Sequence, residues 1–336
     1  MSSTLLLCLW NVPTPLASLA LAIASLGSCL ERALPLQGYG SSLSAGLASL
    51  LLIAVLAKFI CYPKLLLQEL KHPVAGSILP TGTMAVMVIS KAFGHIYPLI
   101  ASHLWLSAVV VHISLLLGFI AYRVQDFSMS MMVPSWFVPP VGIIVSVLTM
   151  PNDRFLYLTL MLLKFGIASY LTLLPILCYR LLFFSEIPDN AKPTLAILAA
   201  PASLSLAGYL TIVASPSLLL VALLSGIAVL MTVIVYCSFY HLLRLPFTPS
   251  YAAFTFPMVI GATALFQLGQ QLSCYSVSAT EHRLLIRMAK VELLIATLMV
   301  AYVCLRYCQH YRRAFVDQRN NKKIESKLYD PTDPAD

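Results

Sequence analysis

Charged side chains are scarce in this sequence. Asp, Glu, Lys and Arg make up 10% of its 336 residues, whereas they make up about 25% of a typical soluble domain. Hydrophobic residues make up 60%. This shortage of charge excludes an ordinary soluble fold and indicates an integral membrane protein, because helices that cross lipid need long runs of apolar side chains.

Signatures of enzymatic chemistry are missing as well. There is no phosphate-binding glycine loop, no nucleophile triad and no zinc-binding HExxH pattern. Most of the eight cysteines fall in or beside apolar runs without metal-ligand spacing, so we interpret them as small packing residues. The sequence therefore predicts that the protein is not an enzyme and that it has no metal site and no cofactor.

What the sequence does contain is a series of apolar runs. Ten of them are long enough to cross about 30 Å of hydrocarbon as α-helices. Their expected bounds are 13–30, 42–62, 73–90, 98–122, 132–150, 155–179, 193–213, 217–240, 248–270 and 284–308. They lack the alternation of a transmembrane β-barrel, so we expect an all-α integral membrane protein with ten transmembrane helices.

The distribution of basic residues predicts the orientation of the chain, whose net charge is +8. If the N-terminus is cytoplasmic, 14 of the 21 Lys and Arg lie on the cytoplasmic side, half of them between Arg306 and Lys327, and six lie on the opposite side. The positive-inside rule then places both termini in the cytoplasm. The excess charge thus reflects membrane topology, and we expect no nucleic-acid partner. The compact chain favours the bacterial inner membrane as its location.

The ten runs are joined mostly by short loops. We expect a ten-helix transmembrane domain over residues 1–310 and a polar, flexible cytoplasmic tail over residues 311–336. No segment outside the membrane is large enough to hold a soluble catalytic domain. The function is therefore expected to lie within the helices.

Proline and glycine alternate along the ten runs. The odd-numbered runs contain Pro and Gly, including Pro80, Pro139, Pro140, Pro201 and Pro257. The even-numbered runs contain one interior proline, Pro175. Kinks free backbone groups that are costly to expose to lipid, so we expect five helical hairpins, with the odd helices in an inner ring and the even helices outside. Tight helix packing is the alternative explanation for any single proline.

The expected inner helices carry no ionisable side chain. Within the bounds given above, the five odd-numbered runs contain no Asp, Glu, Lys, Arg or His. A cation pathway usually has acidic rings, and a proton-coupled transporter usually keeps ionisable groups at its core. A pore lined by Ser, Thr, Tyr and backbone, with basic residues at its mouths, favours anions.

Four motifs connect the chain with a known family. They are HPVAGSILP (72–80), PSWFVPPVG (134–142), PTLAILAAPASLSLAGYL (193–210) and SYAAFTFPM (250–258). In this order, in the third, fifth, seventh and ninth runs, they make the chain similar to the tellurite-resistance/dicarboxylate transporter family over about residues 12–308. That family includes bacterial tellurite-resistance membrane proteins, C4-dicarboxylate (malate) transporters and plant slow anion channels.

The resemblance implies a fold, an assembly and a gate. It implies five hairpins around a pore lined by the odd helices, and three protomers in a homotrimer. In the family, a phenylalanine in the F-x-F motif of the ninth helix plugs the pore, and the matching residue here is Phe256, which we expect to be the pore gate. The other expected site residues are Phe254 and Pro257 in the gate neighbourhood and the pore-helix kinks Pro80, Pro139, Pro140 and Pro201.

Alternatives exist for both phenylalanines of the motif. Phe254 and Phe256 are about 200° apart on one helix, so they cannot both face one lumen. Packing between helices is the alternative role for either residue and the better one for Phe254. The chain has Ala252 or Ala253 where many family members have tryptophan, which predicts looser surroundings for the gate.

Ionisable residues in the even-numbered runs have simpler interpretations. We expect interfacial packing for His103 and His112. Lys164 either contacts an anion or reaches the membrane surface by snorkelling. Glu292, in the charged start of the last run, is expected at the membrane interface.

We interpret the sequence as an anion channel, or channel-like carrier, that moves small inorganic anions and is gated by Phe256. The alternative is a proton-coupled secondary transporter of C4-dicarboxylates such as malate, or of sulfite, with a link to tellurite resistance. A structural membrane protein without transport activity is a third hypothesis.

Overall fold

The computed structural model describes residues 10–272 and 279–328, and all regular secondary structure in these residues is helical. This confirms the expected all-α class. Nine segments of the described chain are long and apolar enough to cross a membrane, and a further apolar segment, residues 134–148, is shorter. The protein is therefore a multi-pass membrane protein.

Five of the helices are long and continuous. They are α3 (Tyr39–Cys61), α7 (Pro98–Gln125), α10 (Leu156–Phe183), α12 (Leu218–Leu242) and α14 (Ala279–Leu328). They correspond to the even-numbered apolar runs of the sequence. Pro175 lies inside α10 without ending it.

The odd-numbered runs form segments that are, except for the first, broken into pieces. The first is α2 (Leu16–Ala33), the third α5 (Ala75–Ile78) with α6 (Pro80–Phe93), the fifth η2 (Pro134–Phe137), α8 (Val138–Val141), η3 (Gly142–Ile144) and α9 (Val145–Leu148), the seventh η5 (Lys192–Ala199) with α11 (Ala200–Ile212), and the ninth η6 (Pro249–Phe254) with α13 (Phe256–Leu272). The η elements are 3-10 helices. We refer to these as the first, third, fifth, seventh and ninth segments.

Prolines explain several of these breaks. Pro139 has no N–H to donate to the carbonyl four residues before it, and the N–H of Val138 donates to that carbonyl instead. In the same way, Ala200 donates to the carbonyl that Pro201 cannot reach. Each exchange replaces a four-residue hydrogen bond by a three-residue one, which is a 3-10 turn. The two carbonyls that the prolines cannot reach are thus satisfied locally.

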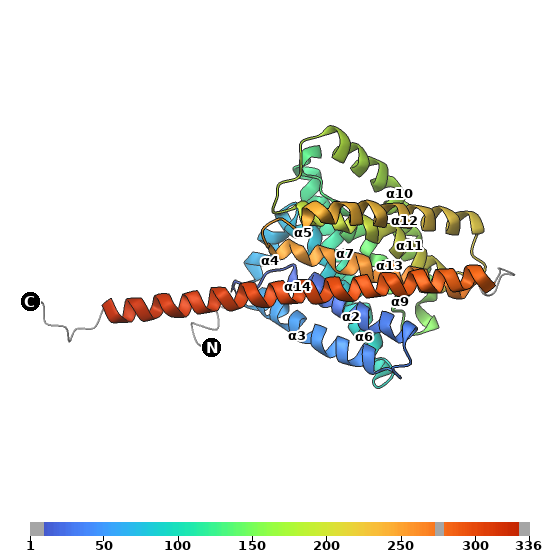
Figure 1. Cartoon of the computed structure of the whole chain (residues 1–336), viewed down its shortest axis with the longest axis horizontal. Helices are drawn as coiled ribbons and strands as arrows, with labels where there is room; N and C mark the ends of the chain where they lie inside the picture. Colours follow the sequence, from blue (N-terminus) through green and yellow to red (C-terminus); the bar gives the residue numbers. More distant parts are fainter. Residues whose placement is uncertain (1–9, 273–278, 329–336) are drawn as a thin grey trace, which may run out of the picture.

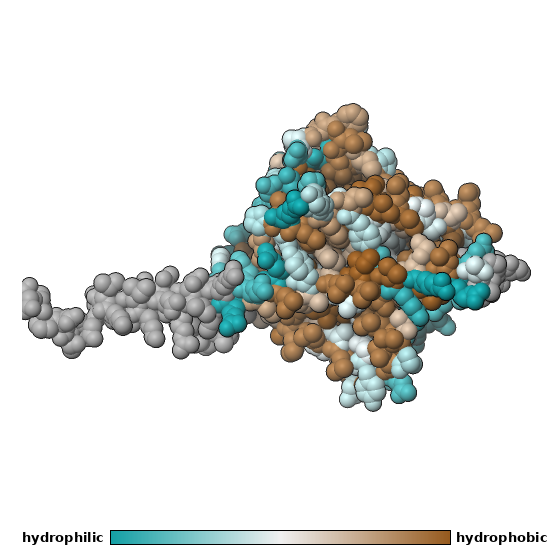
Figure 2. All heavy atoms as spheres, in the orientation of Figure 1, coloured by the Kyte–Doolittle hydropathy of each residue, from teal (hydrophilic) through white to brown (hydrophobic). Residues whose placement is uncertain are grey.

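Burial separates the continuous helices from the broken segments. In the most apolar stretches of the five continuous helices, 22% to 39% of positions are buried, against 61% to 83% in the first, third, seventh and ninth segments. Figure 1 shows α3 and α10 at the periphery and α14 running along the whole face. Figure 2 shows a mostly hydrophobic surface on this face, with hydrophilic residues toward its two ends. Such a surface suits helices that face lipid. A closed inner ring of five helices remains a prediction.

The bundle has two ends. The near end holds Trp10, α4 (Pro63–Lys71) and the point where α14 leaves the bundle, and the far end holds the turns at residues 34–38, 94–97 and 213–217. The backbone of α14 projects beyond the near end and is helical to Leu328. The predicted division of the chain at residue 310, with a flexible cytoplasmic tail, stays a prediction.

Candidate functional site

All five odd-numbered segments meet at one cavity inside the bundle. Its volume is about 50 Å³. It is lined by Pro15, Ser18, Leu21, Ile78, Thr81, Met84, Phe137, Val138, Val141, Gly142, Ile197, Ala200, Pro201, Leu204, Ser250, Ala252, Ala253, Phe256 and Pro257. Most of these side chains are apolar. The cavity lies toward the near end, and we call it the near cavity.

A second cavity of about 50 Å³ lies toward the far end. It is lined by Ser25, Ser28, Cys29, Arg32, Val88, Lys91, Val145, Leu148, Thr149, Phe256, Ile260 and Thr263. These residues come from the first, third, fifth and ninth segments. The second cavity, which we call the far cavity, has more polar walls than the near cavity.

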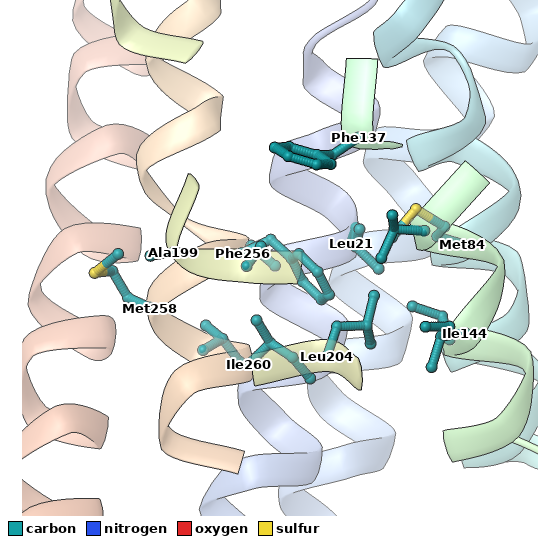
Figure 3. Packing of buried hydrophobic residues seen from close by; sticks show 14 of the residues in the cluster. Leu21, Met84, Phe137, Ile144, Ala199, Leu204, Phe256, Met258 and Ile260 are labelled. Atoms are coloured by element: carbon teal, nitrogen blue, oxygen red, sulfur yellow. The ribbon is translucent and has the colours of Figure 1, made fainter. Parts of the chain in front are cut away.

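Among the described residues, Phe256 alone borders both cavities. It is the first residue of α13, and it is 9% exposed. Figure 3 shows its ring among Leu21, Leu204 and Ile260. The phenyl ring thus borders two spaces that are each large enough for only a few water molecules.

The local sequence holds Phe256 in this position. The 3-10 helix η6 ends at Phe254, and the hydroxyl of Thr255 donates to the carbonyl of Ala252 at 2.6 Å. Pro257 follows as the second residue of α13, where its missing N–H costs no helical hydrogen bond. The ring of Phe256 therefore projects from a helix start whose backbone is well defined.

Phe254 borders neither cavity. It is fully buried, and its ring lies edge-on to Phe239 of α12 and to Tyr251, with centroid separations of 5.5 Å and 4.9 Å. The two phenylalanines of the motif thus lie in different surroundings, in keeping with their angular separation on a helix. The contacts of Phe254 are those of a packing residue.

The four predicted kink prolines lie at or beside breaks in the helices. Pro80 begins α6, with Leu79 between it and the end of α5, and Pro201 is the second residue of α11 after η5. Pro139 and Pro140 form the middle of α8, between two 3-10 helices. Pro201 lines the near cavity, whereas Pro140 faces a groove on the outside of the bundle.

His112 of α7 supports the broken fifth segment. It is completely buried, and its Nε2 lies 2.9 Å from the carbonyl oxygen of Pro139. Because a carbonyl can only accept, Nε2 donates this hydrogen bond. Nδ1 lies 2.8 Å from the hydroxyl of Thr83, so the ring joins the third and fifth segments. The spacing to His103 did not reveal this role. The available signal was a histidine within an apolar helix that is followed along the chain by a segment containing two consecutive prolines.

Hydroxyl groups around the near cavity form hydrogen bonds with other groups of the protein. Ser18 donates to Thr81 at 3.0 Å, and Thr81 donates to the carbonyl of Ile78 at 2.7 Å. Similarly, the hydroxyls of Ser77 and Ser135 lie 2.6 Å apart. These bonds join the segments but leave few free donors for an ion in the near cavity.

Two cations line the far cavity. Arg32 and Lys91 lie in the last turns of α2 and α6, one or two residues beyond the runs that were predicted to be free of charge. The ammonium of Lys91 donates to the carbonyl of Leu148 at 2.7 Å. None of the described residues that line either cavity is Asp or Glu. The electrostatic potential of this site therefore favours anions.

An ion pair joins three elements at the near end. Lys58 Nζ lies 2.5 Å from Glu69 Oε1 and donates to the hydroxyl of Thr14 at 3.0 Å, and Thr14 in turn donates to Glu69. Lys58 is 3% exposed, although the topology prediction counted it with the basic residues of the cytoplasmic side. Thr14 precedes Pro15, which lines the near cavity, so the ion pair holds the start of the first segment beside that cavity.

The expected interfacial position is wrong for Glu292. This residue is 7% exposed and accepts a hydrogen bond from Tyr236 at 2.6 Å. It lies against α13 at Gly261, where a Cβ atom would come within 3.2 Å of its Oε1. It borders neither cavity, and neither does Lys164, which is exposed on α10. The start of α14 was predicted too late in the sequence, which moved Glu292 too close to the membrane surface.

The part of the chain that the structure describes contains no group of three His, Cys, Asp or Glu residues placed to hold a metal ion. The site consists of an apolar near cavity, an aromatic ring that borders both cavities, and a far cavity with two cations. Such an arrangement is suited to the passage of a solute.

Comparisons with known proteins agree with this description. A family model described as voltage-dependent anion channel matches residues 11–308. Two proteins of Methanocaldococcus jannaschii, both described as uncharacterized transporters, are similar to the chain. One is 27% identical over 230 residues, covering 60% of this chain, and the other 25% identical over 238 residues, covering 62%. The matches span 66% and 67% of the length of these relatives.

Proposed function

This chain belongs to the voltage-dependent anion channel family, which confirms the family resemblance found in its sequence, and we propose that it moves small inorganic anions across the membrane as a channel or channel-like carrier. In this proposal the path runs through the near and far cavities, and Phe256 is the gate between them.

The observation that carries the proposal is the position of Phe256 between two cavities. A rigid aromatic ring in a narrow apolar constriction excludes water, and an ion that passes it must give up hydration without receiving new partners. Phe256 has this position because both cavities border it and its side chain is largely buried. The same ring would admit ions if α13 or the side chain moved.

Anions are preferred over cations because of the residues beyond the gate. Arg32 and Lys91 line the far cavity, and no described lining residue is acidic. A cation that enters the far cavity meets two like charges without compensation, whereas an anion is attracted. The description of the family as an anion channel and the names of the two relatives, both uncharacterized transporters, support transport as the activity.

Further proposals concern assembly and location. We propose a homotrimer in the bacterial inner membrane with both termini in the cytoplasm, from the family resemblance and from the excess of basic residues toward the near end. Cysteine accessibility on intact cells tests the orientation, since a cysteine introduced in the turn at residues 213–217 should react with a membrane-impermeant reagent.

Transport by the purified protein in liposomes is the experiment that tests the proposed function. Chloride, nitrate, sulfite and malate are compared at several concentrations, with and without a pH gradient. A channel or channel-like carrier predicts flux of several small anions with little saturation and no need for a pH gradient. The wild type and Phe256→Ala are measured side by side, and empty liposomes provide the baseline.

Other outcomes would lead to other functions. Saturable uptake of malate or sulfite that depends on a pH gradient would replace the proposed channel by a proton-coupled transporter with a link to tellurite resistance. No flux of any anion, even after removal of the gate side chain, would favour a structural role and would overturn transport altogether.

A further inference from the structure

A groove of about 750 Å³ lies on the outside of the bundle between α7 and α10. Apolar side chains of the two helices form most of its walls, and Trp136 and Pro140 of the fifth segment form its floor. Large apolar side chains of the same two helices, including Leu117 and Leu171, are exposed. The groove therefore opens toward the lipid and is separate from both cavities.

Arg123 is the charged residue of this groove. It lies in the last turn of α7 and is 7% exposed. Its Nη2 donates to the carbonyl oxygen of Lys71, and its guanidinium lies 5.9 Å from the centre of the Phe119 ring. Its Nε and Nη1 are buried and have no hydrogen-bond partner among the described residues. Arg123 takes part in none of the ion pairs of this part of the chain.

The two unpartnered donors indicate an anionic ligand. A guanidinium is always charged, and leaving its buried N–H groups without acceptors is unfavourable. An acceptor with several oxygens and a negative charge, such as a phosphate group, relieves this cost through charge-assisted hydrogen bonds. The buried guanidinium of Arg123 thus favours a ligand with a negatively charged group at this end of the groove.

The rest of the groove indicates a long apolar chain on the same molecule. Arg123 is two residues from the end of α7, where the helix reaches the membrane surface at the near end. Leu116, another lining residue, lies about 10 Å deeper along the helix. Phe165 and Leu173 of α10 continue the apolar wall. A charged head at the surface and an apolar chain below it are the two parts of a membrane phospholipid.

We propose that this groove binds an anionic phospholipid, whose phosphate accepts hydrogen bonds from Nε and Nη1 of Arg123 while an acyl chain lies between α7 and α10. The lipid contacts Pro140 on the outer side of α8. Val138 and Val141 of the same helix line the near cavity. The bound lipid therefore lies against the outer face of a segment whose inner face lines the proposed path.

Tryptophan fluorescence offers a direct test because Trp136 lines the groove. The full-length protein is placed in vesicles of phosphatidylcholine with an added fraction of phosphatidylglycerol. In one set of vesicles the phosphatidylcholine carries brominated acyl chains, and in the other set the phosphatidylglycerol does. Bromine quenches the fluorescence of a nearby indole, so the quenching reports which lipid lies beside Trp136. The contribution of Trp136 is obtained by difference from Trp136→Phe. We expect brominated phosphatidylglycerol to be preferred by about tenfold, as one or two charge-assisted hydrogen bonds would produce.

Two variants and one control separate the head from the chain. Arg123→Gln should reduce the preference to within about twofold, because the charge is lost. Ala168→Phe narrows the groove from α10 without touching Arg123, and should reduce quenching by both lipids. Arg154→Gln, an exposed arginine at the far end, should keep the full preference. Ala168→Phe and the wild-type comparison decide the matter if Arg123→Gln does not fold.

Four results would overturn the proposal. They are equal quenching of the wild type by the two brominated lipids, an unchanged preference in Arg123→Gln, unchanged quenching in Ala168→Phe, and loss of the preference when inorganic phosphate is added, which would point to a soluble anion. A fifth result, quenching that appears only after the oligomer is dissociated, would show that a second copy of the chain covers the groove.

Discussion

Replacing Phe256 by alanine removes the ring that separates the near cavity from the far cavity. Each cavity measures about 50 Å³, and Phe256 is the described residue that both share. Alanine leaves only the Cβ atom, so the two spaces should join into one path from Pro15 at the near end to Arg32 at the far end. Leu21, Leu204 and Ile260 around the ring remain in place and keep the path narrow.

The expected increase in anion flux follows from the cost of dehydration. Moving an ion into an apolar constriction costs several kcal/mol, since it loses water without gaining hydrogen bonds. If the ring accounts for about 3 kcal/mol of that barrier, its removal raises the rate of passage by roughly a hundredfold, because about 1.4 kcal/mol corresponds to a factor of ten. We therefore expect chloride conductance in Phe256→Ala to exceed that of the wild type by about two orders of magnitude.

The assay is chloride current across planar bilayers, or chloride efflux from liposomes, at equal protein density. Phe254→Leu is the matched control, because Phe254 packs against Phe239 and Tyr251 and borders neither cavity. It should lower the thermal unfolding midpoint without raising conductance. A folded Phe256→Ala protein whose conductance stays within twofold of the wild type would refute the assignment of the gate.

Three further substitutions test the surroundings of the path. In the Phe256→Ala background, Lys91→Gln should lower the permeability ratio of chloride over potassium, because the far cavity loses one of its cations. The ratio is read from the reversal potential, and an unchanged ratio would contradict the role of the far cavity. Gly27→Ala should lower the free energy of unfolding by about 1–3 kcal/mol, because a Cβ atom there would lie 1.8 Å from the hydroxyl oxygen of Ser44. The loss is measured as a lower unfolding midpoint in detergent, and an unchanged midpoint would contradict the close contact of α2 with α3. Lys58→Met should cost about 3 kcal/mol by leaving the carboxylate of Glu69 without its buried partner, and stability equal to the wild type would show that the ion pair is not formed.

Much of the fold could be predicted because the membrane imposes simple rules on the sequence. The ten expected runs agree with the helical segments to within a few residues at most boundaries, apart from the longer α14. The broken segments follow from proline positions such as Pro139 and Pro201, where the preceding residue donates in a 3-10 turn to the carbonyl that the proline cannot reach. Phe256 could be singled out from its motif, although its role as a gate remains a proposal.

Several features of the candidate site could not be predicted, since they depend on contacts between distant segments. Arg32 and Lys91 lie one or two residues beyond the predicted ends of the uncharged runs. In the structure α2 and α6 extend past these residues, and both side chains line the far cavity. His112 contacts a carbonyl 27 residues away. Glu292 was misplaced because hydropathy does not reveal where a helix begins when its first turns are polar.

The sequence by itself determined that this protein is a bundle of membrane helices with kinked and smooth helices in alternation, because hydropathy, proline and charge act locally along the chain. Only the tertiary structure decided which side chains share a cavity, that the ring of Phe256 borders both spaces, and that two donors of Arg123 are buried without a hydrogen-bond partner among the described residues. These facts depend on the rotation and depth of each helix against its neighbours, which are set by packing among residues far apart in sequence.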